Sequence, residues 1–348
     1  MNVLLTIVAS VFVFGLVIFV HELGHFFVAK KAGIKVNEFA MGMGPTLFKI
    51  TKGETTYALR LFPIGGFVQM EGEDEESEDA RSFPRASIPK RMAVLVAGAA
   101  MNLLLGFLVL VVLTASGGLI ASTTVAEFAP DASTQATGLA VGDRIIAVNG
   151  RRCFVANDVI YEFARTQNYS MDLLVVRNGE QVLLEGVTFA AGEYIDDTTG
   201  EPMQWLVIDF TVYGIKPTVG AVLKESLNAT ISNARLIYLM IFDLIAGRAA
   251  VNDLSGPVGI VSSISQAVSL GWRPVMQMLV LITINLGVVN MLPIPAMDGG
   301  KLLLLIVEAI RRKPLNQKLE IAVNLTGFAL LMLLMVFVSF NDIRRLFF

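Results

Sequence analysis

The feature that most constrains this chain is a set of apolar runs, each long enough to cross a lipid bilayer. Residues 3–20 contain no charged side chain, and further apolar runs lie near 92–116, 275–297 and 320–340. A helix of about 20 apolar residues spans the roughly 30 Å hydrocarbon core of a membrane. Hydrophobic residues make up 54% of the 348, above the roughly 45–50% of soluble domains. We therefore predict a polytopic α-helical membrane protein with about four transmembrane helices.

Basic residues at the ends of these runs indicate a topology. No Lys or Arg precedes the first run, so it lacks the basic region of a secretory signal peptide, and we expect a retained helix. Lysines and arginines are concentrated in 30–91 and 298–318, which the positive-inside rule places in the cytoplasm. Both termini and the long 117–274 segment then lie outside, although Arg344 and Arg345 at the outer end argue against this arrangement.

The runs and the segments between them predict eight parts. In order these are transmembrane helix 1 (1–30), a cytoplasmic or membrane-associated β-region with an acidic linker (31–91), transmembrane helix 2 (92–116), an outer β-rich domain (119–213), an amphipathic interfacial segment (214–274), transmembrane helix 3 (275–300), a cytoplasmic loop (301–318) and transmembrane helix 4 (319–340).

The segment between the first two runs combines alternating apolar residues with turn signals. Residues 57–62 alternate loosely, and 63–70 continue the pattern, after a predicted turn at Gly42-Met-Gly44-Pro45. This pattern predicts a small hairpin sheet. Because the segment is too apolar for a simple cytoplasmic loop, we expect it to dip into the membrane where protein or a water-filled cavity surrounds it. The acidic run from Glu71 to Asp79 predicts a solvated, mobile linker.

The outer segment has a different character, because short strand patterns alternate with turn residues. Asn149-Gly150 and Asn178-Gly179 are strong hairpin signals. Residues 155–166 between them predict a short helix. The single cysteine, Cys153, cannot form an intramolecular disulfide and is expected to be a small buried apolar residue. We predict a compact β-rich domain at 119–213.

Residues 221–247 have apolar positions at helical spacing but too many charges for a comfortable span. An interfacial amphipathic helix is the better prediction. The charged residues are Lys224, Glu225, Arg235 and Asp243.

The strongest chemical signal lies inside the first apolar run. His21-Glu22-Leu23-Gly24-His25 on a helix places two imidazoles at i and i+4, on one face, where they can share a zinc ion. Glu22 lies beside them and can act as the general base for a zinc-activated water. The chain has only two histidines, and both are here. A chance match, or a histidine that only joins helices, explains this coincidence less well, so we predict one Zn²⁺ per chain.

A catalytic zinc needs a third protein ligand, and Asp298 is the best candidate. It follows Asn290 and two prolines, Pro293 and Pro295, which interrupt helical hydrogen bonding in an apolar segment. The alternative is that Asp298 only caps a helix. A carboxylate near hydrocarbon needs a partner, and a metal dication is a strong one. Asn290 is expected to hydrogen-bond an oxyanion or the substrate backbone, with a role in helix packing as the alternative.

The two motifs together resemble the site-2 protease family of intramembrane zinc metalloproteases, specifically its bacterial type with a PDZ domain. The resemblance covers nearly the whole chain. The matching stretches are His21 to His25, Asn290 to Gly300, Gly42 to Gly44, Phe62 to Val68, Ala97 to Asn102, Gly138 to Ile145 and Gly256 to Ile260.

The resemblance implies an endopeptidase that cuts transmembrane segments of single-pass membrane proteins in regulated intramembrane proteolysis. Pre-trimmed anti-sigma factors and remnant signal peptides are the expected substrate classes, with an upstream site-1-type protease as functional partner. It implies that 119–213 is an extracytoplasmic PDZ domain and that 42–70 holds substrate extended. It also implies a bacterial inner or cytoplasmic membrane and an active site toward the cytoplasm. Residues that would support the substrate or the transition state are Asn290, Gly42, Gly44, Gly65, Gly66 and Asn102.

Other functions remain weaker hypotheses. A net charge of −3 with 16% charged residues excludes a basic nucleic-acid-binding surface. A catalytically silent membrane scaffold or chaperone would not need Glu22. A metal transporter would explain neither the single motif helix nor the outer domain. No carboxylate-binding loop is recognisable near 118–125, so peptide binding and size selection both remain open roles for that domain.

Overall fold

The computed structural model describes residues 3–73, 77–166, 168–195, 202–247, 255–313 and 317–347. The chain divides into two compact units, the first formed by Met1–Leu110 with Asn233–Phe348 and the second by Val111–Ser232. Parts of the predicted acidic linker, of the predicted interfacial segment and of the predicted loop at 301–318 lie outside the described residues.

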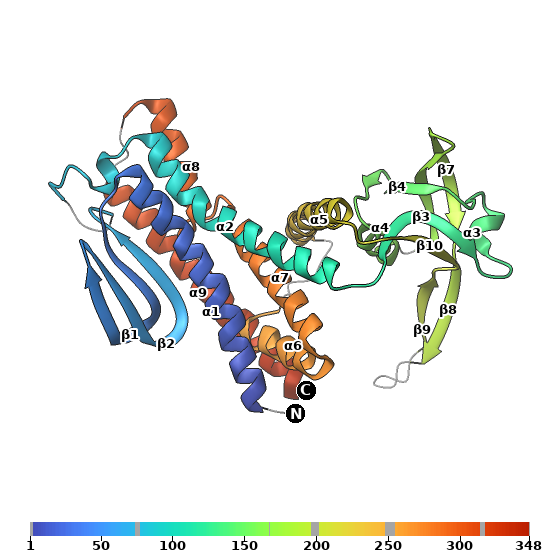
Figure 1. The fold of residues 1–348 in the computed structure, drawn as a ribbon, viewed down its shortest axis with the longest axis horizontal. Helices are drawn as coiled ribbons and strands as arrows, with labels where there is room; N and C mark the ends of the chain where they lie inside the picture. The colour runs from blue at the N-terminus through green and yellow to red at the C-terminus, as the bar shows by residue number, and fades with distance from the viewer. Residues whose placement is uncertain are drawn as a thin grey trace. The chain divides into compact units, whose positions relative to one another are not determined.

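Four helices of the described chain are long and apolar enough to cross a membrane (Figure 1). The exposed side chains of the last one include Leu325, Leu333 and Val336, which suits contact with lipid rather than water. The prediction of four membrane-crossing helices is therefore confirmed. They are α1 (Val3–Ala32), α2 (Ile88–Ala115), α7 (Trp272–Asn290) and α9 (Gln317–Phe347), the apolar span of α9 being Ile321–Arg344.

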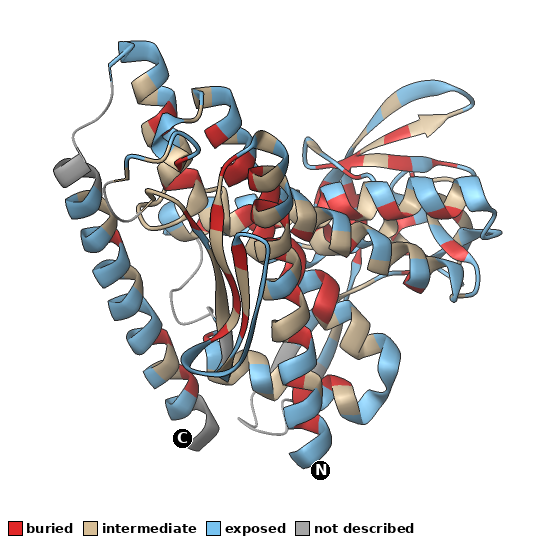
Figure 2. Cartoon of the chain, turned by 60° about the vertical axis from the view of Figure 1, so that its left-hand side comes forward, coloured by how far each residue is buried: buried red, intermediate tan, exposed pale blue. Residues whose placement is uncertain are grey.

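The membrane helices approach one another at small residues. Buried positions recur along the length of α1 (Figure 2). A Cβ added to Gly24 of α1 would lie 2.4 Å from the carbonyl oxygen of Ala97 on α2. A Cβ added to Gly287 of α7 would lie 3.1 Å from the carbonyl oxygen of Ala99. Small residues allow such backbone-to-backbone contact in membranes, so α1 and α7 pack closely on α2.

The region between α7 and α9 differs from the prediction. The predicted third span, 275–300, is interrupted at 291–297, after α7, and its last three residues begin a separate helix, α8 (Asp298–Arg311), which also takes up much of the predicted loop at 301–318. Pro293 and Pro295 explain the break, because proline lacks the N–H that a continuing helix would need.

The predicted interfacial segment, 214–274, also contains more than one element. It forms α5 (Val219–Ile245), as expected for the amphipathic stretch, and a separate helix, α6 (Pro257–Leu270). Pro257 stands at the first turn of α6, where its missing N–H costs no hydrogen bond.

The N-terminus of α6 is capped by a residue from α9. The N–H groups of Gly256 and Gly259 donate to the carboxylate of Asp342, at 3.1 Å and 2.8 Å. A Cβ on Gly256 would lie 2.7 Å from the same carboxylate. The Gly256-Pro-Val-Gly259 sequence therefore opens a helix whose free N–H groups are satisfied by another helix.

Two long strands, β1 (Val36–Lys52) and β2 (Thr55–Met70), fold back on each other beside α1 (Figure 1). Residues 38–41 of β1 pair with 66–69 of β2 on one side and with 56–59 on the other. The segment 66–70 consequently forms one edge of this sheet.

The turn of this hairpin lies elsewhere than predicted. The strands reverse at Gly53, whereas Gly42 and Gly44, predicted to form the turn, lie within β1 and bend it. Both have φ of +84°, which residues with a Cβ rarely adopt. A Cβ on Gly42 would also lie 2.5 Å from the carbonyl oxygen of Phe62.

The described part of the acidic segment after β2 makes polar contacts with the start of β1 and the residues before it. Hydrogen bonds from Ser77, Lys35 and Asn37 lower the pKa of Glu71 to about 2. Lys35 also reaches the carboxylate of Asp79 at 3.3 Å. The short helix η1 (Phe83–Arg85) then leads into α2.

The second unit is an antiparallel sheet with small helices around a single core (Figure 1). Its two predicted hairpin turns are confirmed, because Asn149-Gly150 and Asn178-Gly179 join paired strands with positive φ at all four residues. Cys153 is buried, as expected. The sheet order is β10-β3-β4-β6-β7, with β5 on β4 and a separate β8-β9 hairpin. The elements are β3 (Ile120–Phe128), α3 (Ser133–Ala136), β4 (Arg144–Val148), β5 (Arg151–Arg152), α4 (Ala156–Ala164), β6 (Ser170–Arg177), β7 (Glu180–Thr188), β8 (Ala190–Ile195), β9 (Pro202–Val207) and β10 (Phe210–Ile215).

Candidate metal centre

Two histidines lie on one face of α1, one turn apart. His21 and His25 are each 7% exposed, and their Nε2 atoms are 3.1 Å apart. The i, i+4 spacing places both rings on the same side of the helix. Gly98 on α2 leaves room for them, because a Cβ there would lie 2.4 Å from His25 Nε2 and 2.6 Å from His21 Cε1.

Asp298 reaches the histidines from the start of α8. Its Oδ2 lies 3.2 Å from His21 Nε2 and 3.3 Å from His25 Nε2. The N-cap of α8 is Met297, so Asp298 does not occupy the capping position that was the alternative. The structure therefore brings together the three residues that the sequence nominated as metal ligands.

The residues after Asp298 explain how the chain turns so tightly here. A Cβ on Gly299 would lie 2.2 Å from the carbonyl oxygen of Leu292, and a Cβ on Gly300 would lie 2.2 Å from that of Ile294. Only glycine fits where the loop lies directly against the first turn of the helix.

The three facing atoms are electron-pair donors. His25 Nδ1 lies 2.8 Å from the carbonyl oxygen of Val94, which places the ring proton on Nδ1 and leaves a lone pair on Nε2. Asp298 Oδ2 is buried and has no hydrogen-bond partner among the described residues. Such atoms repel one another at 3.1–3.3 Å unless they share a cation.

The size of this triangle suits zinc. Tetrahedral zinc binds histidine nitrogen and carboxylate oxygen at about 2.0–2.2 Å, so its ligand atoms lie about 3.3 Å apart. His21, His25 and Asp298 form a possible metal-binding group on this geometry. Two imidazoles and one carboxylate also leave a fourth position open, which is the pattern of a catalytic zinc site.

Asn102 of α2 contacts the second ring nitrogen of His21, Nδ1. It is fully buried, with Nδ2 3.4 Å from His21 Nδ1, and within the described part of the chain its Oδ1 has no hydrogen-bond partner. Exchanging the amide oxygen and nitrogen lets Oδ1 accept the Nδ1 proton of His21, which satisfies both groups. Each imidazole then has a protein acceptor that orients it, a common arrangement around metal-binding histidines.

Asn290 lies beside the triangle at the end of α7. Its Nδ2 is 3.3 Å from His21 Nε2. An amide N–H is a donor and not a ligand, so this position suits a contact to a negatively charged oxygen next to the metal.

Glu22 lines a cavity of about 370 Å³ next to the triangle. Gly66 of β2 lies against it, since a Cβ on Gly66 would be 3.2 Å from Glu22 Cγ. On the same wall, Lys301 Nζ donates to Glu73 Oε1 at 2.8 Å. The cavity is therefore bounded by α1, the start of α8 and the edge of β2. Its lining residues are His21, Glu22, His25, Gly66, Phe67, Val68, Gln69, Met70, Glu73, Leu95, Asp298 and Lys301.

The remaining nominated glycines are not in the lining of this cavity. Gly42 and Gly44 bend β1, and Gly65 has φ of +82° where β2 passes Met43. Residues that the sequence did not nominate are Gly98, Glu73 and Lys301. The small residues of the Ala97-to-Asn102 stretch were the available signal for Gly98.

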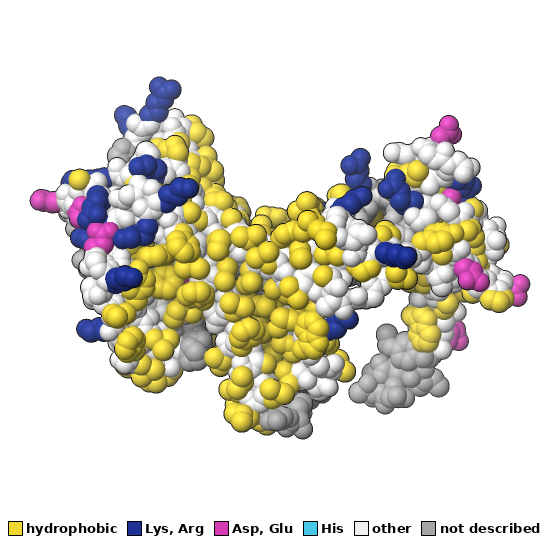
Figure 3. All heavy atoms as spheres, viewed as in Figure 1, with side chains coloured by type: hydrophobic (Ala, Val, Ile, Leu, Met, Phe, Trp, Pro, Cys, Tyr) yellow, Lys and Arg dark blue, Asp and Glu magenta, His cyan; other side chains and the backbone are white. Residues whose placement is uncertain are grey.

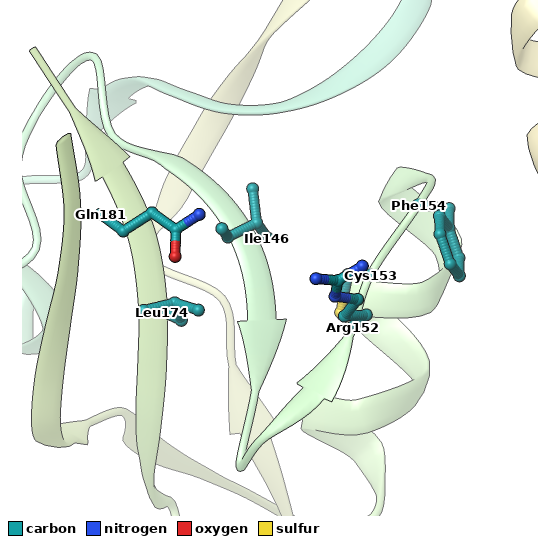
Figure 4. Close-up of a pocket in the computed structure, with 6 residues that line it drawn as sticks. All are labelled: Ile146, Arg152, Cys153, Phe154, Leu174 and Gln181. Carbon is teal, nitrogen blue, oxygen red and sulfur yellow. The ribbon is translucent and has the colours of Figure 1, made fainter. Parts of the chain in front are cut away.

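A second cavity, of about 190 Å³, lies in the other unit between β4, β5, β6 and β7 (Figure 4). Arg152 is the one charged residue in its lining, and Cys153 Sγ contacts the carbonyl oxygen of Arg151 at 3.7 Å. The lining offers no set of ligands or acid and base groups like that around Glu22. Its lining residues are Ile146, Arg152, Cys153, Phe154, Leu174 and Gln181.

Comparison with known proteins agrees with this geometry. Residues 9–334 match Peptidase family M50. The chain is 33% identical to a Clostridium acetobutylicum protein with a provisional zinc metalloprotease name, over 97% of both chains. It is 31% identical to zinc metalloprotease RasP of Shouchella clausii, over 98% of this chain and 99% of that one. It is 29% identical to the regulator of sigma-W protease RasP of Bacillus subtilis, over 98% and 99% of the two chains.

Proposed function

The chain belongs to peptidase family M50, the site-2 protease family, and on that premise we propose that it hydrolyses peptide bonds within transmembrane segments of single-pass membrane proteins. It is a bacterial membrane protein and a zinc metalloendopeptidase of the site-2 type. The observation that carries the proposal is the triangle of His21, His25 and Asp298 beside Glu22, with both histidines and Glu22 on α1, a helix long enough to span a bilayer.

His21, His25 and Asp298 are the proposed zinc ligands, with Asn102 and the Val94 carbonyl as the groups that orient the two rings. These three residues would hold a zinc ion that, when bound, would polarise a peptide carbonyl and lower the pKa of water toward about 7. Glu22 takes a proton from the attacking water and returns it to the leaving amine. Asn290 donates its amide N–H to the developing oxyanion.

The edge of β2 is the proposed binding site for unwound substrate. Residues 66–70 lie in the cavity wall, and 66–69 pair with β1 on one side. An extended peptide added on the other side would satisfy the N–H and C=O groups that a substrate helix releases when it unwinds. In lipid each such group would otherwise cost several kcal/mol. Gly66 brings this edge against Glu22, whereas Gly42, Gly44 and Gly65 would act by shaping the strands.

We propose that the cavity opens toward the cytoplasm. Lys90 Nζ donates to the carbonyl oxygen of Ala32 at 2.8 Å, which joins the basic ends of α1 and α2. Arg91 pairs with Glu308 of α8 through 2.5 Å and 3.3 Å contacts. Figure 3 shows most of the visible Lys and Arg side chains of the first unit near this end, together with several acidic ones, and a largely hydrophobic surface below them. By the positive-inside rule this end is cytoplasmic.

The second unit supports the proposal of an extracytoplasmic PDZ domain at 119–213, because it is a compact β-rich fold with the expected hairpins. Regulated intramembrane proteolysis of membrane-anchored anti-sigma factors is one proposed role, since a relative is named for regulating sigma-W. Such a role needs a site-1-type protease to trim the substrate first. Remnant signal peptides are the other substrate class.

The test separates metal binding from catalysis. Purified protein is expected to hold one zinc per chain, His21→Ala and His25→Ala to lose it, and Glu22→Gln to keep it while losing cleavage. Asp298→Asn should weaken zinc binding and stop cleavage, because an amide oxygen is a poorer ligand than a carboxylate. Zinc is measured by mass spectrometry of the purified protein. Zinc retained after both histidines are replaced would overturn the assignment.

The same Glu22→Gln variant identifies the substrate. It keeps the metal site and binds substrate without turnover, so single-pass membrane fragments should accumulate in cells that carry it. Proteomics of the membrane fraction, compared with the active enzyme, reads out those fragments. A scaffold without catalysis predicts identical fragment profiles for both.

A further inference from the structure

The turn that presents Asp298 contains a residue in an unfavourable conformation. Met297 N–H donates to the carbonyl oxygen of Ile294 at 3.2 Å, which closes a β-turn with Pro295 and Ala296 at its centre. Ala296 has φ of +69°. Because proline fixes a negative φ at the first central position, the turn is type II. Its second central position normally belongs to glycine, since a Cβ disfavours this backbone conformation.

Two residues of α9 hold this turn. Asn324 Oδ1 accepts a hydrogen bond from Ala296 N–H at 3.2 Å. Gly327, one turn further along α9, lies against Pro295, where a Cβ would approach Pro295 Cβ to 2.3 Å. Residues three apart share a helix face, so α9 contacts both central residues of the turn from one side.

The hydrogen bond from Ala296 is specific to the type II form. Rotating the peptide between Pro295 and Ala296 gives a type I turn, in which the second central residue has a negative φ that alanine accepts readily. That rotation points Ala296 N–H away from Asn324. Asn324 Oδ1 therefore favours the type II turn, which alanine at its second central position disfavours.

We propose that Asn324 is a positioning residue for Asp298: it holds the Ile294–Met297 turn in its type II form, and so keeps the carboxylate within reach of His21 and His25. Asp298 follows this turn directly, with Met297 as the N-cap of α8. Loss of the type II form therefore redirects the start of α8 and its first side chain. This role rests on the proposed function, in which Asp298 is a zinc ligand.

The experiment pairs Asn324→Leu with a second-site change. Leucine removes the acceptor at similar size and suits an apolar helix. In detergent-purified full-length protein, zinc affinity measured by competition with a chelator should fall about 10- to 100-fold, as for other groups that orient metal ligands. The kcat for a transmembrane peptide should fall with little change in KM.

Adding Ala296→Gly should restore zinc affinity and kcat, because glycine adopts the type II position without the Asn324 hydrogen bond. Ala296→Gly alone should bind zinc at least as tightly as the starting protein. Thr326→Ala is the matched control on α9, since Thr326 Oγ1 donates to the carbonyl oxygen of Ala322 in its own helix, and it should change neither quantity.

Unchanged zinc affinity in Asn324→Leu would overturn the proposal. So would a loss that Ala296→Gly does not restore, because Asn324 would then act only in helix packing. The Asp298→Asn variant distinguishes a wrong role for Asn324 from a wrong assignment of the zinc ligands. If Asp298→Asn keeps zinc, the ligand assignment itself is wrong and the role of Asn324 falls with it. If Asp298→Asn loses zinc and Asn324→Leu does not, only the role of Asn324 is wrong.

Discussion

Gly98 controls how closely α2 approaches the two histidines. Its hydrogen atom faces both imidazole rings, and the position that a Cβ would take is 2.4 Å from His25 Nε2. The contact joins helix backbone to ring, so no flexible side chain end can move away. The absence of a side chain at Gly98 therefore allows both the close packing of α1 on α2 and the position of the two imidazole rings.

We expect Gly98→Ala to weaken zinc binding at least 10-fold, because the new methyl group forces the rings apart. Chelator competition on the purified variant measures the loss. Gly15→Ala is the matched control, since nothing lies within 4 Å of a Cβ there, and alanine favours helix. Full zinc occupancy and affinity in Gly98→Ala would show that the helices separate at no cost to the site.

At the scale of elements, α6 depends on a carboxylate from α9. Asp342→Ala removes the acceptor of the Gly256 and Gly259 N–H groups and is expected to cost about 1–2 kcal/mol of stability, as for a lost helix cap. Thermal unfolding in detergent should show a midpoint lower by about 2–4 °C. Ser269→Ala, at an exposed position on α6, should leave the midpoint unchanged. Equal midpoints for both variants would contradict the capping role.

The sheet of the second unit contains a buried carboxylate, Asp143, at the start of β4. Burial alone would raise its pKa, but hydrogen bonds from Arg177 and from Ala140 N–H outweigh burial and hold the pKa below its usual value near 4. The ionised form therefore stabilises the unit above about pH 4, and this contribution is lost as pH falls through the lower folded-state pKa.

We expect Arg177→Met to destabilise the protein by about 1–3 kcal/mol at pH 7 and by less at pH 3, where Asp143 can take up a proton. Thermal unfolding of the full-length protein at both pH values measures the difference. Arg144→Met, at an exposed position of β4, is the control. A loss from Arg177→Met that is the same at pH 3 and pH 7 would exclude ionised Asp143 as its partner.

The helices and hairpins follow from local patterns, so the sequence predicts them well. Apolar runs predict the four spans, and the Asn-Gly pairs predict the two turns of the second unit. The glycines of β1 were misassigned because positive φ serves a strand bend as well as a turn. The contacts of the acidic linker were not predicted because Glu71 and its partner Lys35 lie far apart in sequence. Amphipathic α8 lacks the long apolar run by which the four spans were found.

The site shows the same difference between what local sequence patterns predict and what depends on contacts between distant residues. The spacing of His21, Glu22 and His25 predicts their proximity, since one turn of a helix fixes it. Asp298 was predicted from chemistry, because a carboxylate near hydrocarbon needs a partner. Gly98 and the Glu73–Lys301 pair depend on how separate elements pack, which local spacing does not encode.

At the scale of the whole molecule, the two compact units suggest separate roles in catalysis and in substrate selection. The first unit contains every proposed catalytic residue and the described residues that line the cavity beside Glu22. We therefore expect the second unit to select substrates rather than to cut them.

Replacing 125–212 with a short Gly/Ser bridge should allow cleavage of full-length substrates that the intact enzyme refuses. His21, Glu22, His25 and Asp298 should remain essential in the shortened enzyme. The measurement compares one substrate with and without its outer domain, in both enzymes. If the shortened enzyme folds and keeps zinc but loses activity on the trimmed substrate, the domain recruits substrate and does not exclude it.

The wide separation of the proposed ligands along the chain affects synthesis of the protein. His21 and His25 leave the ribosome with the first helix, whereas Asp298 follows only after most of the chain has been translated. A nascent chain therefore carries the base Glu22 and two ligands in the membrane well before it can complete the metal site. On the proposed assignment, products that end before Asp298 would lack one ligand, so we expect proteolytic activity to begin only after Asp298 has been added to the chain.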